Sequence, residues 1–297
     1  MRLKFKTPAK INLGLKILRK RDDGFHELET IFQMVDWFDD IELSPLEQGI
    51  ELECNTPEIP TDASNLVFKA ALLLKEAYPD TPGVHIKLIK SIPSGAGLAG
   101  GSGNAAGTLL ALNRMWDLRL TPAQLQPFAE KLGSDVPFFL HSPCALGCGR
   151  GEKLTTLQAP KKFKVLLVSP NFSIPTGSVY SRLNLKLTTD QNHISILQKF
   201  ISNADLPGLG ARLFNDLECV VVESHRIIGE IKEEMRRLGA CGSLLSGSGS
   251  TVFAIFDNAQ TAQTALESFP KGAWNVRLSE SVEHFSEFLP DEILNYP

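Results

Sequence analysis

Residues 93–106 read Pro93-Ser-Gly-Ala-Gly-Leu-Ala-Gly-Gly-Ser-Gly-Asn-Ala-Ala106, with five glycines between Pro93 and Asn104. The preceding residues 84–88 alternate apolar and polar side chains as a half-buried strand does, and residues 104–113 are rich in helix formers. A strand, a glycine-rich loop and a helix N-terminus in this order can hold phosphate, because free backbone N–H groups and the positive end of the helix dipole face the anion. Glycine permits the close approach and the unusual φ values that such a loop needs. This stretch therefore predicts a bound nucleotide.

Composition limits the classes of partner. The chain has 297 residues, of which 43% are hydrophobic and 22% charged, as in a globular protein of one large or two ordinary domains. Its net charge of −4 and the lack of a basic tail argue against nucleic acid or an anionic membrane as partner. No apolar run approaches the roughly 18 residues that span a bilayer, and the N-terminus lacks the apolar core of a signal peptide. We expect a cytoplasmic protein that acts on a small molecule as a monomer or weak homodimer.

The cysteines are odd in number and scattered, which predicts reduced thiols rather than a disulfide framework. They are Cys54, Cys144, Cys148, Cys219 and Cys241. Cys144 and Cys148 are close together, but no CxxC pattern or histidine accompanies them. They are expected to be small, half-buried residues on a strand.

The pattern along the chain predicts an α+β protein. Strands are expected at 11–17, 31–35, 41–53, 84–88, 163–168 and 252–256, and helices at 64–77, 104–113, 122–132 and 219–238. Thr121 and Pro122 are suited to the start of the third of these helices, and Gly133 to its end. A polar segment interrupted by proline at 155–162 divides the chain, so we predict domains at 1–155 and 156–297.

The loop also matches GxGxxG from Gly95 to Gly100, the fingerprint of dinucleotide-binding folds. Such a fold needs a repeated βαβ series and an acidic residue ending the second strand about 20 residues later, whereas Asp117 lies at a predicted helix end. The strings that mark protein kinases and Walker A loops are also missing. The loop therefore either binds phosphate in another way or is a structural turn.

Three further motifs decide between these readings. They are Pro8-Ala-Lys-Ile-Asn-Leu13, Gly133-Ser-Asp-Val-Pro-Phe138 and Gly247-Ser-Gly-Ser-Thr251. Together with the glycine-rich loop, in this order and at these spacings, they resemble the GHMP superfamily of small-molecule kinases over nearly the whole chain. The resemblance implies a two-lobed α+β fold, with an N-terminal lobe like the second domain of ribosomal protein S5 and a C-terminal α/β lobe. It also implies an active site in the cleft between the lobes.

The resemblance assigns Asp135 as the catalytic base, with Lys10 beside it. A nearby cation keeps a carboxylate ionised at neutral pH, and the lysine can also screen phosphate charge. Without the family, Ser134-Asp135-Val136-Pro137 could equally be a helix cap, and Lys10 a surface residue on a strand.

The resemblance also makes the glycine-rich loop the ATP site. The expected contacts are Pro93, Ser94, Gly95, Ala96, Gly97, Leu98, Ala99, Gly100, Gly101, Ser102 and Gly103. The commonest superfamily wording is Gly-Leu-Gly-Gly-Gly-Ser-Ser, so here Ala99 replaces a glycine and Gly103 replaces the second serine. Mg²⁺ is expected, because the triphosphate charge must be neutralised. Its ligands stay unassigned, with Ser102 as the remaining candidate.

Two more segments resemble one branch of the superfamily, which phosphorylates the 2-hydroxyl of a cytidine diphosphate-linked methylerythritol in the non-mevalonate route to isoprenoids. They are Asp23-Gly-Phe-His26 and Ser173-Ile-Pro-Thr176 followed by Tyr180. In that branch the cytosine lies between two aromatic rings, here Phe25 and Tyr180, and a histidine, here His26, reads its polar edge. Asn12 and Thr176 match positions that orient the substrate. The ordinary alternatives are Phe25 as a cap on a turn, His26 as an exposed residue and Tyr180 as core.

Three other functions stay open from the sequence. Another GHMP kinase, of the homoserine or phosphomevalonate type, would share the loop and Asp135 but would not need Phe25, His26 and Tyr180. A nicotinamide-dependent oxidoreductase is suggested by GxGxxG alone. A binding protein on the same fold would hold nucleotide without turnover.

Overall fold

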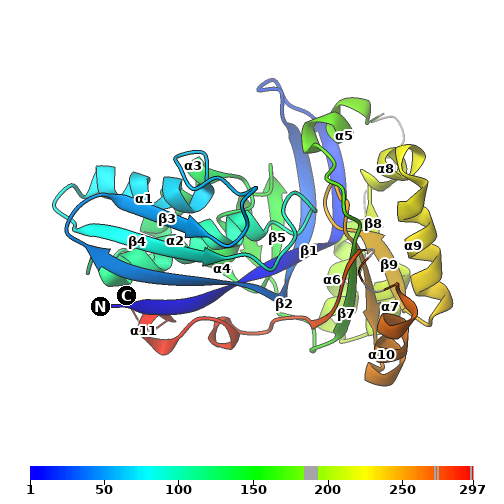
Figure 1. Cartoon of the computed structure of the whole chain (residues 1–297). Coiled ribbons are helices and arrows are strands. Elements are labelled where there is room, and N and C mark those ends of the chain that lie inside the picture. Colours follow the sequence, from blue (N-terminus) through cyan, green and yellow to red (C-terminus); the bar gives the residue numbers. More distant parts are fainter. Residues whose placement is uncertain (184–192, 271, 273, 295, 297) are drawn as a thin grey trace.

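The computed structural model of the chain describes residues 1–183, 193–270, 272, 274–294 and 296. These residues form two lobes, each with its own β-sheet (Figure 1). Within the described residues, the sheet of the first lobe has seven strands and that of the second has four. The predicted α+β architecture of two lobes is confirmed.

The first sheet is built around a long antiparallel pair, β1 and β2. Its strands are β1 (Leu3–Lys20), β2 (His26–Leu46), β3 (Ile50–Cys54), β4 (Gly83–Ile89), β5 (Cys144–Gly149), β6 (Lys153–Thr156) and β8 (Phe214–Asn215). The order is β3-β4-β2-β1-β8, with β5 paired to β2 and β6 to β5. The prediction of separate strands at 31–35 and 41–53 was wrong. β2 runs unbroken through the first and into the second, and the chain turns only at Gly49, whose φ is +79°.

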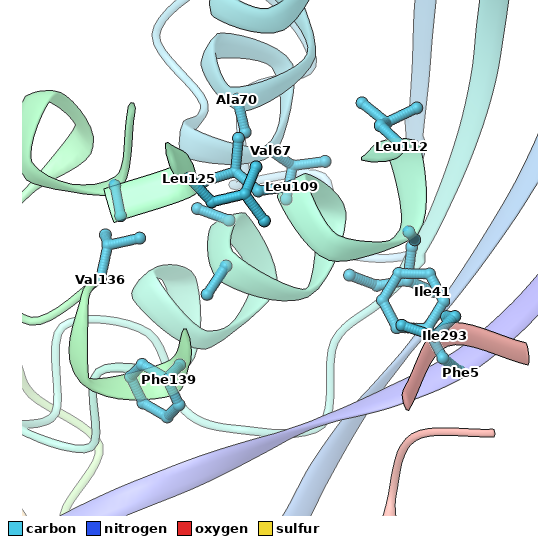
Figure 2. Packing of buried hydrophobic residues seen from close by; sticks show 14 of the residues in the cluster. Phe5, Ile41, Val67, Ala70, Leu109, Leu112, Leu125, Val136, Phe139 and Ile293 are labelled. Carbon is cyan, nitrogen blue, oxygen red and sulfur yellow. The ribbon is translucent and has the colours of Figure 1, made fainter. Parts of the chain in front are cut away.

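Within the described residues, four helices of the first lobe precede β5: α1 (Leu66–Ala77), α2 (Gly100–Met115), α3 (Pro122–Leu132) and α4 (Phe138–His141). The predicted start and end of α3 are confirmed, because Thr121 forms a capping box with Gln124 and Gly133 is the C-cap. Figure 2 shows Val67 of α1, Leu109 of α2 and Leu125 of α3 meeting in the core of this lobe. The helices therefore hold α2, and the glycine-rich loop before it, against the sheet.

The C-terminal segment returns to the first lobe (Figure 1, red). It contains a short 3₁₀ helix, η2 (Phe285–Glu287), and α11 (Asp291–Leu294). The N–H of Lys6 donates to the carbonyl of Phe288 at 3.1 Å, and Ile293 lies in the core of the first lobe. The predicted domain boundary at 155/156 stays a prediction. The core of the first lobe also includes residues from the end of the chain.

The second lobe has an antiparallel sheet in the order β11-β7-β10-β9. Its strands are β7 (Lys164–Ser169), β9 (Gly242–Leu245), β10 (Val252–Phe256) and β11 (Asn275–Glu280). Its described helices are α5 (Thr176–Arg182), α6 (His193–Ser202), α7 (Leu206–Ala211), α8 (Glu218–Ser224), α9 (Arg226–Arg237) and α10 (Ala259–Ser268). The predicted strands at 163–168 and 252–256 are confirmed.

The prediction of one helix over 219–238 was wrong. α8 and α9 are separated by His225, whose φ of −136° and ψ of 77° lie outside the helical region. The His225 ring stacks on Phe172, with centroids 5.2 Å apart and planes at 15°. The break between α8 and α9 therefore coincides with a tertiary contact of the His225 side chain. The residues on either side of His225 are Ser224 and Arg226, so no proline or glycine in the sequence marks this break.

All five cysteines are free thiols, as expected, and Cys144 and Cys148 lie on β5. Burial raises the pKa of the Cys144 thiol to about 12. No helix among the described residues is both long and apolar enough to cross a membrane.

Candidate active site

A cavity of about 1090 Å³ opens between the two lobes. Its wall combines parts of β1 and β2, the loop before α2, the turn at Ser134 and Asp135, and the start of α5. The turn between β9 and β10 closes it from the second lobe through Gly247 and Ser248. The expected cleft between lobes is therefore present.

Lys10 and Asp135 meet in this cavity. Lys10 Nζ lies 2.7 Å from Asn12 Oδ1 and 3.6 Å from Asp135 Oδ2, and it donates to the carbonyl of Gly97 at 3.3 Å. Lys10 is only 4% exposed, so it is not the surface residue that its strand position also allowed. Burial lowers the pKa of Lys10, and the charge of Asp135 acts in the opposite direction.

Lys10 and Asp135 are held by two separate segments, strand β1 and the turn before α4. Lys10 and Asn12 are two residues apart on β1 and so share one face of the strand. Asn12 Nδ2 donates to Thr30 Oγ1 at 2.8 Å, which fixes the amide with its oxygen toward Lys10. Asp135 lies in the turn before α4, whose N-cap is Pro137 with no side-chain cap. Asp135 is therefore not the helix cap that its sequence context allowed.

The turn of the second lobe clamps the glycine-rich loop. Gly97 has a φ of +81°, and a Cβ built on it would lie 2.1 Å from the carbonyl oxygen of Ser246. Ser246 Oγ donates to the carbonyl of Gly97 at 2.9 Å, and the Thr251 N–H donates to that of Ala96 at 3.1 Å. This turn joins strand β9 to strand β10.

The end of the loop presents free donors to the cavity. Ala99, with a φ of +52°, is the N-cap of α2, and no side chain caps this helix. The first-turn N–H groups of an α-helix have no intrahelical acceptor. Gly100, Gly101 and Ser102 of that turn all line the cavity. This N-terminus of a 16-residue helix is suited to a phosphate group.

Two residues of the predicted ATP loop lie away from the cavity. Leu98 and Gly103 are not part of the cavity wall, unlike the other residues of 93–103. Leu98 is fully buried in the core, and its carbonyl accepts from the Lys10 N–H at 3.0 Å. A Cβ on Gly103 would lie 2.7 Å from the carbonyl oxygen of Pro8. The missing serine is thus explained by the close packing of α2 on β1.

A buried carboxylate behind the loop was not found by sequence reasoning. Asp39, on β2, is fully buried. Its Oδ1 accepts from the N–H groups of Ser91 and Ile92 at 2.7 and 2.9 Å. Its Oδ2 accepts from Asn104 Nδ2 at 2.9 Å and pairs with Lys90. One side chain therefore holds both ends of the loop, and nothing in the sequence sets Asp39 apart from its acidic neighbour Asp40.

The aromatic residues expected to hold the acceptor line the same cavity. The rings of His26 and Tyr180 are in contact, with centroids 5.0 Å apart and planes at 37°. Phe25, in the turn before β2, is half exposed and lines the same cavity. Burial lowers the pKa of His26, so its ring is neutral at pH 7. Thr176 Oγ1 lies 2.9 Å from Ser248 Oγ, at the start of α5.

Arg150 is a second residue that sequence reasoning missed. It lies in the turn between β5 and β6 and lines the cavity. Its guanidinium carbon is 3.8 Å from the centroid of the Phe25 ring, and its Nη2 donates to Ser134 Oγ at 3.2 Å. Its place between Gly149 and Gly151 indicated a turn but not a position in the site.

Comparison with known proteins agrees with this geometry. The family model "GHMP kinases N terminal domain" matches residues 65–143, and "GHMP kinases C terminal" matches residues 197–274. The 4-diphosphocytidyl-2-C-methyl-D-erythritol kinase of Clostridium beijerinckii is 40% identical over 280 residues, which cover 94% of this chain and 100% of that protein. The chain belongs to the 4-diphosphocytidyl-2-C-methyl-D-erythritol kinase family of GHMP kinases. The protein of the same name from Syntrophus aciditrophicus is 42% identical over 95% of this chain and 100% of its own.

Solved structures place the chain among the same kinases. A crystal structure of a 4-(cytidine 5'-diphospho)-2C-methyl-D-erythritol kinase matches with a TM-score of 0.82 at 31% identity, over 94% of this chain and 99% of that one. A homoserine kinase from Cytophaga hutchinsonii matches with a TM-score of 0.74 at 20% identity, over 95% of each chain, which shows a shared fold alone. The dinucleotide-binding alternative is wrong, because the glycine-rich loop of this GHMP kinase leaves a largely antiparallel sheet and not a doubly wound parallel one.

Proposed function

We propose that this protein transfers the γ-phosphoryl group of ATP to the 2-hydroxyl of 4-diphosphocytidyl-2-C-methyl-D-erythritol, giving the 2-phosphate and ADP. The observation that carries the proposal is one cavity that holds three parts. The wall of this cavity carries the Lys10–Asp135 pair, the uncapped N-terminus of α2 and the His26–Tyr180 pair. The activity named for relatives about 40% identical over nearly their full length supports it.

In this proposal Asp135 accepts the proton of the acceptor hydroxyl. The adjacent cation of Lys10 keeps the carboxylate ionised, and it also stabilises negative charge on the attacking oxygen. Asn12 and the carbonyl of Gly97 hold the ammonium group in place. Phosphoryl transfer needs little covalent chemistry from the protein, so catalysis rests on positioning and electrostatics.

ATP binds with its phosphates at the loop and the first turn of α2. We assign these contacts to residues 93–97 and 99–102, where a cradle of glycines and free N–H groups lines the cavity. Among the described residues, no group of three or more His, Cys, Asp or Glu side chains could hold a metal ion. A Mg²⁺ ion would therefore be held mainly by phosphate oxygens, with the Ser102 hydroxyl as the protein ligand. When bound, the ion would neutralise the charge of the triphosphate.

The acceptor binds at the part of the cavity wall formed by Phe25, His26 and Tyr180. Phe25 and Tyr180 offer ring faces for the cytosine, and stacking on such faces is worth about 1–3 kcal/mol per base. Neutral His26 offers one donor and one acceptor to the polar edge of the base. Asn12 and Thr176 orient the methylerythritol toward Asp135.

A coupled ADP-release assay with three acceptors tests the proposal. The purified protein, ATP and Mg²⁺ are combined with the diphosphocytidyl acceptor, homoserine or phosphomevalonate. We expect ADP with the first alone. Turnover with homoserine or phosphomevalonate instead would assign the chain to another GHMP kinase activity. Nucleotide binding without turnover on any acceptor would favour a binding protein.

A further inference from the structure

Arg150 contacts both Phe25, which is expected to stack on the acceptor base, and the turn that carries Asp135. Its guanidinium covers the Phe25 ring at 3.8 Å, and its Nη2 reaches Ser134, the residue before Asp135. Gly149 and Gly151, on either side, have φ values of +75° and +109° and give the turn the conformation that projects this side chain. The arginine therefore spans the distance between a stacking residue and the catalytic turn.

Arg150 forms no ion pair within the described residues, although the pKa of the Asp23 carboxyl is lowered by its hydrogen bond with Arg21 and, to a smaller extent, by the charge of Arg150. The Nε of Arg150 is buried without a hydrogen-bond partner. The other lysine or arginine side chains on the described cavity wall are Lys10 and Lys20. Lys10 already contacts Asn12, Gly97 and Asp135. A guanidinium stacked on a ring keeps N–H donors at its edge, which suits it to bind phosphate oxygens through two bonds.

The chemistry of the acceptor indicates what reaches this position. Resting on the proposed function, the cytosine lies near His26 and Tyr180, and the reacting hydroxyl lies near Asp135. The diphosphate that joins the two halves must pass between them, along the side chain of Arg150. We propose that Arg150 binds this diphosphate and so selects an acceptor linked to a nucleoside diphosphate over one that carries only the nucleoside.

Binding calorimetry tests this without relying on turnover. Dissociation constants for CDP, cytidine and ADP are measured on wild type, Arg150→Met and Arg150→Lys. Methionine keeps an apolar contact over Phe25 but lacks the charge. We expect Arg150→Met to weaken CDP by about 10- to 100-fold, the range for a hydrogen bond to a charged group. Cytidine and ADP should change less than about threefold, and Arg150→Lys should recover part of the CDP affinity.

Arg19→Met is the matched control, because Arg19 is an exposed arginine on the same hairpin as Phe25 and lies off the cavity wall. It should leave all three affinities unchanged. If Arg150→Met weakens cytidine as much as CDP, Arg150 acts only through the Phe25 ring and the inference is wrong. If it weakens ADP instead, the bound phosphate is that of ATP, which also refutes it. Unchanged cytidine binding by Arg150→Met shows that this variant is folded. If the wild type releases no ADP with the acceptor, that result refutes the proposed function but not the role of Arg150 in binding CDP.

Discussion

Replacing Gly97 with alanine tests how the second lobe positions the glycine-rich loop. Gly97 has a φ of +81°, a region that costs an L-residue about 1–2 kcal/mol. The new Cβ would also lie 2.1 Å from the carbonyl oxygen of Ser246 and 3.1 Å from the N–H nitrogen of Gly249. Both neighbours are backbone atoms, so they cannot turn away as a side chain would.

The expected magnitude follows from these two terms. Overpacking of a well-packed site costs about 1–3 kcal/mol, so the sum with the backbone strain is about 2–5 kcal/mol. If the turn of the second lobe shifts to relieve the contact, the cost in stability falls. In that case the hydrogen bond from Ser246 to Gly97 is lost and the loop moves, so ATP affinity falls instead.

The assay compares urea unfolding and ATP binding of Gly97→Ala with those of Gly49→Ala. Gly49 has nearly the same φ, +79°, but no atom within 4 Å of a built Cβ. Both variants share the backbone strain and the effect of alanine on the unfolded chain, so their difference isolates the clash. We expect Gly97→Ala to be less stable by about 1–3 kcal/mol, or to bind ATP at least about tenfold more weakly. Equal stability together with unchanged ATP affinity would refute the reasoning.

Three further predictions concern the loop and the acceptor site. Gly103→Ser restores the superfamily serine but places a Cβ 2.7 Å from the Pro8 carbonyl oxygen, so we expect a loss of about 1–3 kcal/mol in unfolding free energy and no gain in Mg²⁺ affinity. Asp39→Asn leaves the Lys90 charge buried without its counterion; unfolding experiments should show a loss of about 3–5 kcal/mol, most of it recovered when Lys90→Met is added. Burial lowers the pKa of His26 from 6.5, so the acceptor KM should stay flat above pH 6.5 and rise as the pH falls through that lower pKa, because protonation replaces a ring acceptor by a donor. A flat profile in wild type, or the same rise in His26→Gln, would contradict the role of His26.

Local signals predicted much of the fold, and most of the site residues that the resemblance implied line the cavity. The capping residues Thr121 and Gly133 stand where the sequence placed them, because a cap depends on a few neighbouring residues. The motifs around Lys10, Asp135 and the glycine-rich loop are brought together as the resemblance implied. These residues lie far apart in the chain, so the prediction that they meet depended on the order and spacing of several motifs and not on any single pattern.

The features that were missed depend on tertiary neighbours. Gly103 looked like a lost hydroxyl, whereas its role in packing becomes visible only with Pro8 beside it. Asp39 collects donors from residues 51 to 65 positions away in the chain. Arg150 stands in a turn of ordinary composition, and its contact with Phe25 joins residues from two separate turns. No periodicity or short motif carries this information.

The product of the reaction tests the central claim most directly. Phosphorus NMR of wild type and Asp135→Asn, each incubated with ATP, Mg²⁺ and the diphosphocytidyl acceptor, follows ADP and the new phosphate monoester together. Wild type should form one monoester, on the 2-hydroxyl, in equal amount to ADP. Asp135→Asn should form it about 10²- to 10⁴-fold more slowly, the usual contribution of a positioned base. A wild type that forms no phosphorylated acceptor, or an Asp135→Asn variant as fast as wild type, would contradict the assignment of this site.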